Sequence, residues 1–170
     1  MNATDHFALF DLPRSFALDA AQLEAAWKHV AQAVHPDRFA TRSAPERRVA
    51  MQWSAQANEA YRVLKRPLLR ARYLCELAGV DLQTETNTAM APEFLVQQMS
   101  WHEQLDECLE DPQNNLAREA LSQEIELALA HCQQAVSEAL SAEQYKQAAS
   151  RIREWMFLDK LTTQLQTIEV

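Results

Sequence analysis

Residues 20–64 decide the fold, and they read AAQLEAAWKHVAQAVHPDRFATRSAPERRVAMQWSAQANEAYRVL. Apolar residues recur about every 3.6 positions on both sides of Pro36, a period typical of amphipathic helices. Pro36 ends the first helix, and Ser43 with Glu46 forms a capping-box pattern that opens a second helix. Two helices of similar length joined by a loop of several residues are expected to pack as an antiparallel hairpin, with residues 35–39 at its exposed tip.

The buried faces of this hairpin follow from the same spacing. Asp19 is expected to cap the first helix, and the second helix is expected to run through Leu64. The predicted stripe of the first helix comprises Leu23, Trp27, Val30 and Val34. The predicted stripe of the second comprises Val49, Trp53, Ala57, Ala60, Tyr61 and Leu64.

More helices flank the hairpin on both sides. A short helix is expected over residues 5–10, and Pro67 begins another that ends near Ala78, where Gly79 suits the position after a helix. The later helices are expected over Pro92 to Glu110, over Leu116 to Leu140, and from a capping-box pattern at Ser141 and Gln144 onward. The sequence therefore predicts an all-α protein: a first domain over residues 1–78, a linker over 79–89, and a three-helix bundle over 90–170.

Charge separates the two halves of the chain. Residues 1–75 carry 11 Lys/Arg and 7 Asp/Glu, a net charge of +4, whereas residues 76–170 carry 5 and 17, a net charge of −12. The acidic half disfavours a phosphate backbone, and the basic half has no cationic stripe interleaved with aromatics, so no nucleic-acid partner is expected. Two domains with different protein partners are predicted, and the basic half suits an acidic protein.

Composition excludes several classes of protein. The single glycine, Gly79, leaves no glycine-rich phosphate loop, which excludes kinase, Rossmann and P-loop interpretations. No apolar stretch approaches the roughly 20 residues of a membrane span, and no basic-then-apolar leader begins the chain, so a soluble, cytoplasmic protein without a membrane partner is expected. Cys75, Cys108 and Cys132 match neither a disulfide framework nor a metal knuckle and are expected to be reduced core thiols.

The tripeptide His35-Pro36-Asp37 is the most distinctive motif of the hairpin tip. It can be an ordinary helix stop, with His35 exposed and Asp37 capping the next turn. Alternatively, the rigid proline presents an imidazole and a carboxylate to a partner. A metal-dependent hydrolase using His29, His35 and Asp37 is disfavoured, because the two histidines are six positions apart and no HxxxH or HExxH spacing is present.

The order of these elements resembles the J-domain of DnaJ-type co-chaperones over about residues 4–75. The resemblance rests on the aromatic first helix with Phe7 and Phe10, the His-Pro-Asp tip, and the Asn58 to Tyr61 segment before Leu64. It implies that the tip engages a DnaK-class chaperone and stimulates its ATPase. The residues implied to contact the chaperone are His35, Pro36, Asp37, Arg38 and Lys28. The helix before the tip carries fewer bases than is usual in that family, with only Lys28 and His29 there.

The first helix of the predicted bundle has more apolar surface than one core can use. On a helical wheel the arc of Phe94, Trp101, Leu105 and Cys108 faces the bundle core. Leu95, Val96 and Met99 fall elsewhere on the wheel, together with Glu103 and Glu107. These apolar residues either widen the buried stripe or form an acid-rimmed patch that binds a protein. Phe157, between two stripes of the last helix, either extends this patch or belongs to the core.

Across nearly the whole chain the sequence resembles the HscB family of co-chaperones in iron–sulfur cluster assembly. The matching segments are His35 to Phe39, Pro67 to Ala71, Phe94-Leu95, Glu103 to Glu107 and Phe157 to Leu161. The resemblance implies that the hairpin addresses an HscA-type chaperone and that the bundle holds the scaffold protein IscU. The implied scaffold contacts are Leu95, Val96, Met99, Glu103, Glu107 and Phe157. Ser100 stands where the family commonly has Glu, which removes one charge.

The sequence thus predicts a co-chaperone with no catalysis, cofactor or metal site of its own. Some relatives carry an N-terminal cysteine-rich metal module, and this sequence lacks it. The chain is expected to tether the scaffold to the chaperone and to trigger ATP turnover in that partner, since linking two modest sites raises their effective concentration. The alternative is a general J-protein whose bundle dimerises or captures unfolded clients.

Overall fold

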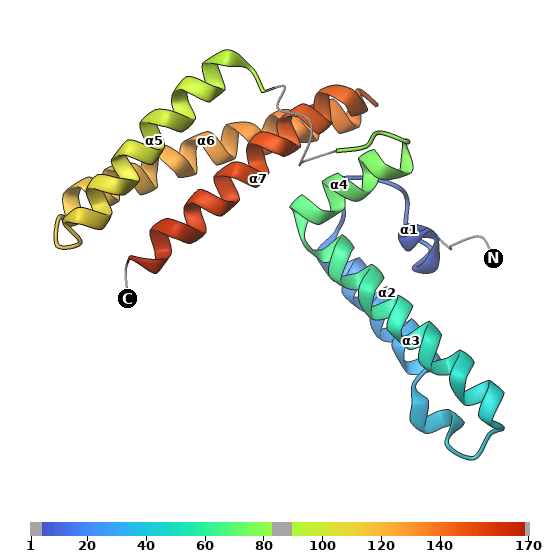
Figure 1. Ribbon diagram of the computed structural model, residues 1–170. Helices are drawn as coiled ribbons and strands as arrows, with labels where there is room; N and C mark the ends of the chain where they lie inside the picture. The colour runs from blue at the N-terminus through green and yellow to red at the C-terminus, as the bar shows by residue number, and fades with distance from the viewer. Residues whose placement is uncertain (1–4, 83–89, 169–170) are drawn as a thin grey trace. The chain divides into compact units, whose positions relative to one another are not determined.

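The computed structural model describes residues 5–82 and 90–168, and all regular structure in these ranges is helical. Figure 1 shows the helices in chain order. They are α1 His6–Leu9, α2 Ala20–Ala33, the 3-10 helix η1 Pro36–Phe39, α3 Ala44–Lys65, α4 Pro67–Leu77, α5 Pro92–Glu110, α6 Asn115–Ser141 and α7 Tyr145–Thr167. The prediction of an all-α fold is confirmed. By its contacts the chain forms two compact units that divide between Leu74 and Cys75.

The first unit is built on the hairpin of α2 and α3, which lie side by side (Figure 1). Asp19 caps α2 by accepting from the Ala21 backbone N–H at 2.8 Å, and the predicted capping box at the start of α3 is present. The Trp27 ring stacks on Tyr61 with centroids 4.6 Å apart. The fully buried residues of the hairpin are Leu23, Ala50, Ala57, Ala60 and Leu64. Alanines at the contact let the two helix backbones approach closely.

Two residues of the predicted α3 stripe are exposed, and Tyr61 is half-buried. Val49 is 52% exposed and Trp53 is 39% exposed, whereas Ala50 is buried in their place. The α3 helix has 22 residues against 14 in α2, so its amino-terminal half extends beyond the partner helix. The sequence period identified the helix correctly, but the prediction of which large apolar residues face α2 was wrong for these two.

The short α1 helix is fixed by local polar contacts. The Asp5 carboxylate caps it by accepting from the Phe7 backbone N–H at 3.0 Å, and Phe7 is fully buried. The His6 backbone N–H donates to the hydroxyl of Tyr73 in α4 at 3.0 Å. The amino-terminal helix is therefore tied to α4 by a hydrogen bond as well as by burial.

The second unit contains the bundle of α5, α6 and α7, with α6 and α7 packed side by side along much of their length (Figure 1). Its fully buried side chains include Leu121, Ile125, Val136, Ile152, Leu158 and Leu161. The predicted capping box at Ser141 is wrong, because α6 continues to Ser141 and α7 begins at Tyr145 without a side-chain cap. The chain reverses through Glu143, whose φ of 56° is in the left-handed region.

Cys75, Cys108 and Cys132 are buried free thiols, as the sequence predicts. Burial raises the pKa of Cys75 to about 11 and that of Cys132 to about 12. The Cys132 thiol contacts the Arg151 carbonyl oxygen, with Sγ at 3.1 Å. These thiols therefore serve as small apolar packing groups.

Two other expectations concern boundaries and membranes. Part of the predicted linker, residues 83–89, lies outside the described residues, and the predicted domain boundaries remain predictions. Within the described ranges, no helix is both long enough and apolar enough to cross a membrane.

Candidate functional site

The tip of the hairpin is a capped 3-10 turn. His35 is the N-cap of η1, and its Nδ1 accepts a hydrogen bond of 3.3 Å from the Asp37 backbone N–H. The Arg38 backbone N–H donates to the His35 carbonyl oxygen at 3.0 Å. The Asp37 side chain is 91% exposed, with Oδ2 3.6 Å from His35 Nδ1. The turn thus holds a free carboxylate outward on an ordered backbone.

Arginine side chains tie the tip to both helices of the hairpin. Arg38 donates from Nη1 to the Gln32 carbonyl oxygen near the end of α2, at 3.2 Å. Arg47, in the first turn of α3, donates from Nη1 to the Ala40 carbonyl oxygen at 3.4 Å. These bonds satisfy carbonyl groups that helix ends and turns leave open. The segment that carries Asp37 is therefore anchored on both sides.

The capping box at the start of α3 ends the loop that follows η1. The Ser43 backbone N–H and hydroxyl both donate to the Glu46 carboxylate, at 2.9 and 2.6 Å. The hydroxyl bond is the main cause that lowers the pKa of Glu46, followed by the backbone bond. Glu46 thus remains ionised as a cap at neutral pH.

Lys28 lies on the exposed side of α2, on the approach to the tip. Its Nζ is 2.6 Å from Glu24 Oε1, and this hydrogen bond raises the pKa of Lys28 and lowers that of Glu24. A shallow, mainly apolar groove runs beside it, lined by Trp27, Lys28, Ala31, Gln32, His35 and Arg38. Three of the predicted chaperone contacts, Lys28, His35 and Arg38, therefore line one surface next to Asp37.

The tip exposes a carboxylate beside basic side chains. Within residues 5–82 and 90–168, no three His, Cys, Asp or Glu side chains lie where they could hold one metal ion. An exposed aspartate on an anchored turn can accept a charge-assisted hydrogen bond from a cation on another protein. The basic side chains on the same surface favour approach of an acidic partner.

A second candidate surface lies on α5. Leu95, Val96 and Met99 are 43, 69 and 67% exposed. Glu103 and Glu107, one and two turns further along, are also exposed. Trp101, Leu105 and Cys108 on the other side of the helix are buried, which confirms three members of the core arc predicted from the wheel. The fourth, Phe94, is half-buried against Trp101. One face of α5 is thus apolar in its first half and acidic in its second, and we call these five residues, Leu95, Val96, Met99, Glu103 and Glu107, the α5 face.

One acceptor on α6 binds two donors of α5. Glu124 Oε1 accepts from Trp101 Nε1 at 3.0 Å and from Gln97 Nε2 at 2.9 Å. Both donors lie on the side of α5 away from Leu95, Val96 and Met99. This pair of bonds, together with the buried Trp101, Leu105 and Cys108, is consistent with an outward α5 face.

Phe157 of α7 belongs to an aromatic cluster with α5. Its ring centroid lies 5.8 Å from Phe94, 6.2 Å from Trp101 and 5.5 Å from His102. Edge-to-face contacts dominate, a favoured geometry for aromatic pairs. Phe157 is half-buried, so it supports α5 and still presents part of its ring. Ser100 accepts from Gln104 Nε2 at 3.3 Å and adds no charge to the surface.

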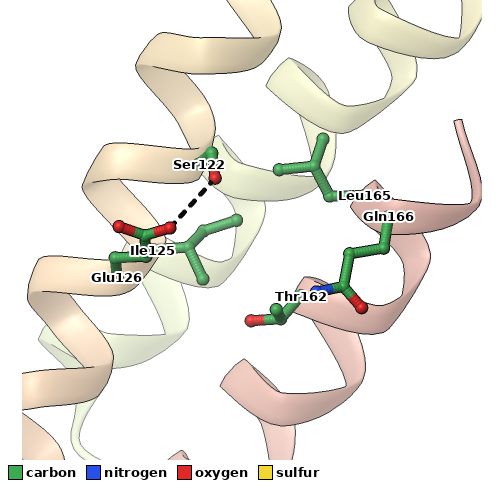
Figure 2. Close-up of a pocket in the computed structure, with 6 residues that line it drawn as sticks. All are labelled: Ser122, Ile125, Glu126, Thr162, Leu165 and Gln166. Carbon is green, nitrogen blue, oxygen red and sulfur yellow. Dashed lines mark hydrogen bonds between the residues drawn. The ribbon is translucent and has the colours of Figure 1, made fainter. Parts of the chain in front are cut away.

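Figure 2 shows a pocket between α6 and α7 that the sequence did not indicate. Ile125 and Leu165 line it with Ser122, Glu126, Thr162 and Gln166. Ser122 donates to Glu126 at 3.4 Å, and the Thr162 hydroxyl donates to the Leu158 carbonyl oxygen at 2.9 Å. These two hydroxyls are thus engaged within their own helices, and none of the predicted site residues lines the pocket.

The sequence is closely similar to curated co-chaperones along its full length. It is 58% identical to a co-chaperone protein HscB homolog of Bordetella pertussis over 170 residues, which cover 99% of this chain and 98% of the relative. It is 46% identical to the HscB homolog of Cupriavidus taiwanensis, over 92% of this chain and 89% of the relative. A family model described as the HSCB C-terminal oligomerisation domain matches residues 90–166.

Solved structures show the same likeness. Chaperone HscB from Vibrio cholerae superposes with a TM-score of 0.90 at 34% identity, covering 96% of this chain and 97% of that one. Human co-chaperone protein HscB superposes with a TM-score of 0.91 at 25% identity, covering 100% of this chain and 84% of that one.

The fold and these relatives define the class, and the chain is an all-α co-chaperone. It belongs to the HscB family, as the resemblance in the sequence implied.

Proposed function

We propose that the chain is a two-site adaptor in iron–sulfur cluster assembly. The His-Pro-Asp tip binds an HscA-type chaperone of the DnaK class and stimulates its ATPase, and the α5 face with Phe157 binds an IscU-type scaffold protein. The chain itself catalyses nothing in this scheme. Three buried free thiols fit a reducing compartment such as the cytoplasm.

The observation that carries the proposal is the exposure of large apolar side chains on α5 opposite a well-packed face. Leu95, Val96 and Met99 are exposed although Trp101, two residues beyond Met99, is 3% exposed. A contiguous apolar patch beside carboxylates is typical of a protein-binding surface, with an apolar centre and a polar rim. Membership of the HscB family supports an iron–sulfur scaffold as its partner.

The tip supports the chaperone half of the proposal. The Asp37 side chain is 91% exposed on a turn that His35 caps, and the groove beside the turn is lined by Lys28, His35 and Arg38. A hydrogen-bonded backbone at this turn loses little conformational entropy when the Asp37 carboxylate pairs with a partner arginine. Pro36 has no N–H and therefore adds no unpaired backbone donor to the turn.

A second function is favoured by one observation. The family model for residues 90–166 is described as an oligomerisation domain, and the bundle also exposes Leu109, Leu116 and Leu127. A general J-protein whose bundle associates with a second copy, or captures unfolded clients, would use such surfaces.

Calorimetric titration of the purified chain separates these functions. The adaptor is expected to bind folded, purified IscU-type scaffold with 1:1 stoichiometry while sedimenting as a monomer. A chain that is dimeric at micromolar concentration and binds only unfolded peptides would favour the general J-protein. The chaperone half is tested by the steady-state ATPase rate of an HscA-type chaperone, which the chain is expected to raise.

A further inference from the structure

The Asp37 backbone N–H has no backbone acceptor within the turn at the tip. The first backbone N–H groups of a helical turn lack partners within the turn. At η1 the first residue is Pro36, which has no N–H, and the Arg38 N–H already donates to the His35 carbonyl oxygen. The Asp37 N–H is therefore the one open donor at the start of η1, and His35 Nδ1 accepts from it at 3.3 Å.

This bond depends on which ring nitrogen of His35 carries a proton. A nitrogen that accepts a hydrogen bond carries no proton, so this bond requires a bare Nδ1 on His35. A proton on Nδ1 would instead donate toward Asp37 Oδ2, which lies 3.6 Å away. The same nitrogen therefore either orders the Asp37 backbone or engages the Asp37 carboxylate.

We infer that His35 is a positioning residue for Asp37. Its Nδ1 caps η1 and so fixes the backbone that presents the exposed Asp37 carboxylate to a cation of the chaperone. This inference rests on the proposed function of the tip and adds a separate role to one of its residues.

Variants of His35 differ in whether they keep an acceptor within reach of the Asp37 N–H. The Asn side-chain oxygen is bonded to Cγ, as is Nδ1 of His, so His35→Asn places an acceptor at the same distance from the backbone. Asn is also among the preferred N-caps. The acceptor of Gln is one carbon further out, and Ala has none. If instead the imidazole contacts the chaperone directly, all three variants are expected to lose stimulation of the ATPase to a similar extent.

The test measures the stimulated ATPase rate of an HscA-type chaperone with the full-length chain and its three His35 variants. His35→Asn is expected to retain stimulation within about threefold of the original chain, whereas His35→Gln and His35→Ala lose about fivefold or more, the factor that corresponds to a lost N-cap. Thermal unfolding followed by circular dichroism shows that each variant is folded.

A second measurement needs no chaperone. In ¹⁵N-labelled chain at pH 8, the ring shifts of His35 are expected to show an unprotonated Nδ1 and a protonated Nε2. The Asp37 amide proton is expected to show the small temperature coefficient of a bonded donor in the original chain and in His35→Asn, and a larger one in His35→Gln.

Either of two results would overturn the inference. The first is equal loss of stimulation in His35→Asn and His35→Gln. The second is a His35 ring protonated on Nδ1 in the neutral form. A different failure belongs to the proposed function: if the original chain does not stimulate the ATPase at all, the chaperone role falls, and the amide and ring measurements still decide whether His35 is the cap.

Discussion

The indole Nε1 of Trp101 donates to Glu124 Oε1 at 3.0 Å and thereby joins α5 to α6 on the side opposite the α5 face. Glu124→Ala removes the acceptor of a nearly buried indole and is expected to lower the free energy of unfolding by about 1 to 2 kcal/mol. Glu124→Gln keeps a side-chain oxygen and is expected to cost less. Urea unfolding followed by tryptophan fluorescence measures both.

The matched control for this variant is Glu126→Ala, which removes another exposed carboxylate of the same helix. Its one described bond, from Ser122, is 3.4 Å long (Figure 2), so little loss of stability is expected. Equal stability of Glu124→Ala and the original chain would show that packing alone sets the rotation of α5.

The α5 face is expected to contribute to binding and not to folding. Leu95→Ala combined with Met99→Ala should weaken scaffold binding at least tenfold, because apolar groups at the centre of an interface dominate its energy. The free energy of unfolding should change by less than about 1 kcal/mol, since surface substitutions away from the core have small effects. Calorimetric titration and urea unfolding of the same preparation provide both values.

Two single variants calibrate this result. Leu105→Ala, at a residue that is 4% exposed, should destabilise the chain by about 2 to 5 kcal/mol. Leu127→Ala, at an exposed leucine of α6, should leave both quantities unchanged. A double variant as unstable as Leu105→Ala would place Leu95 and Met99 in the core.

Asp37→Asn removes the charge at the tip and leaves a side chain of the same shape. It is expected to reduce stimulation of the chaperone ATPase at least tenfold, because a charge-assisted bond to a partner cation is lost at the interface. Scaffold binding should be unchanged. Asp11→Asn is the control, since Asp11 is also exposed, and Asn tolerates its φ of 54°. Retained stimulation in Asp37→Asn would contradict the role of the carboxylate.

Thiol reactivity follows from burial. With the pKa of Cys75 raised to about 11 and that of Cys132 to about 12, the thiolate fraction of either at pH 8 is below about one in a hundred. Alkylation by iodoacetamide is expected to be slow in the folded chain and fast in urea, as read by mass spectrometry. Rapid labelling of Cys132 under native conditions would show that α6 and α7 open locally.

The sequence predicted most of the fold because helix period and caps are local signals. Asp19 and the Ser43 with Glu46 pair marked real helix starts. The same logic failed at Ser141, which is the last residue of α6, while Gln144 stands just before α7 and the turn through Glu143 supplies the reversal. Whether a helix ends at a local cap or continues past it depends on tertiary contacts, which a sequence pattern does not contain.

The candidate sites were predictable to different extents. The wheel placed Leu95, Val96 and Met99 away from the core arc, and their exposure agrees with it. The long-range bonds of Glu124 to α5 could not be foreseen, since they depend on the register between two helices. The cap by His35 had a local signal that could have been used, a polar side chain directly before a proline at the start of a turn.

The most direct test of the adaptor is whether one molecule must carry both sites. Scaffold and chaperone are sedimented together with the original chain, with each of the two variants Asp37→Asn and Leu95→Ala/Met99→Ala, and with an equimolar mixture of them. The original chain is expected to carry scaffold into the chaperone peak. The mixture is not, because each variant keeps only one site and no single molecule carries both. Scaffold that travels with the chaperone in the mixture as it does with the original chain would contradict the two-site adaptor.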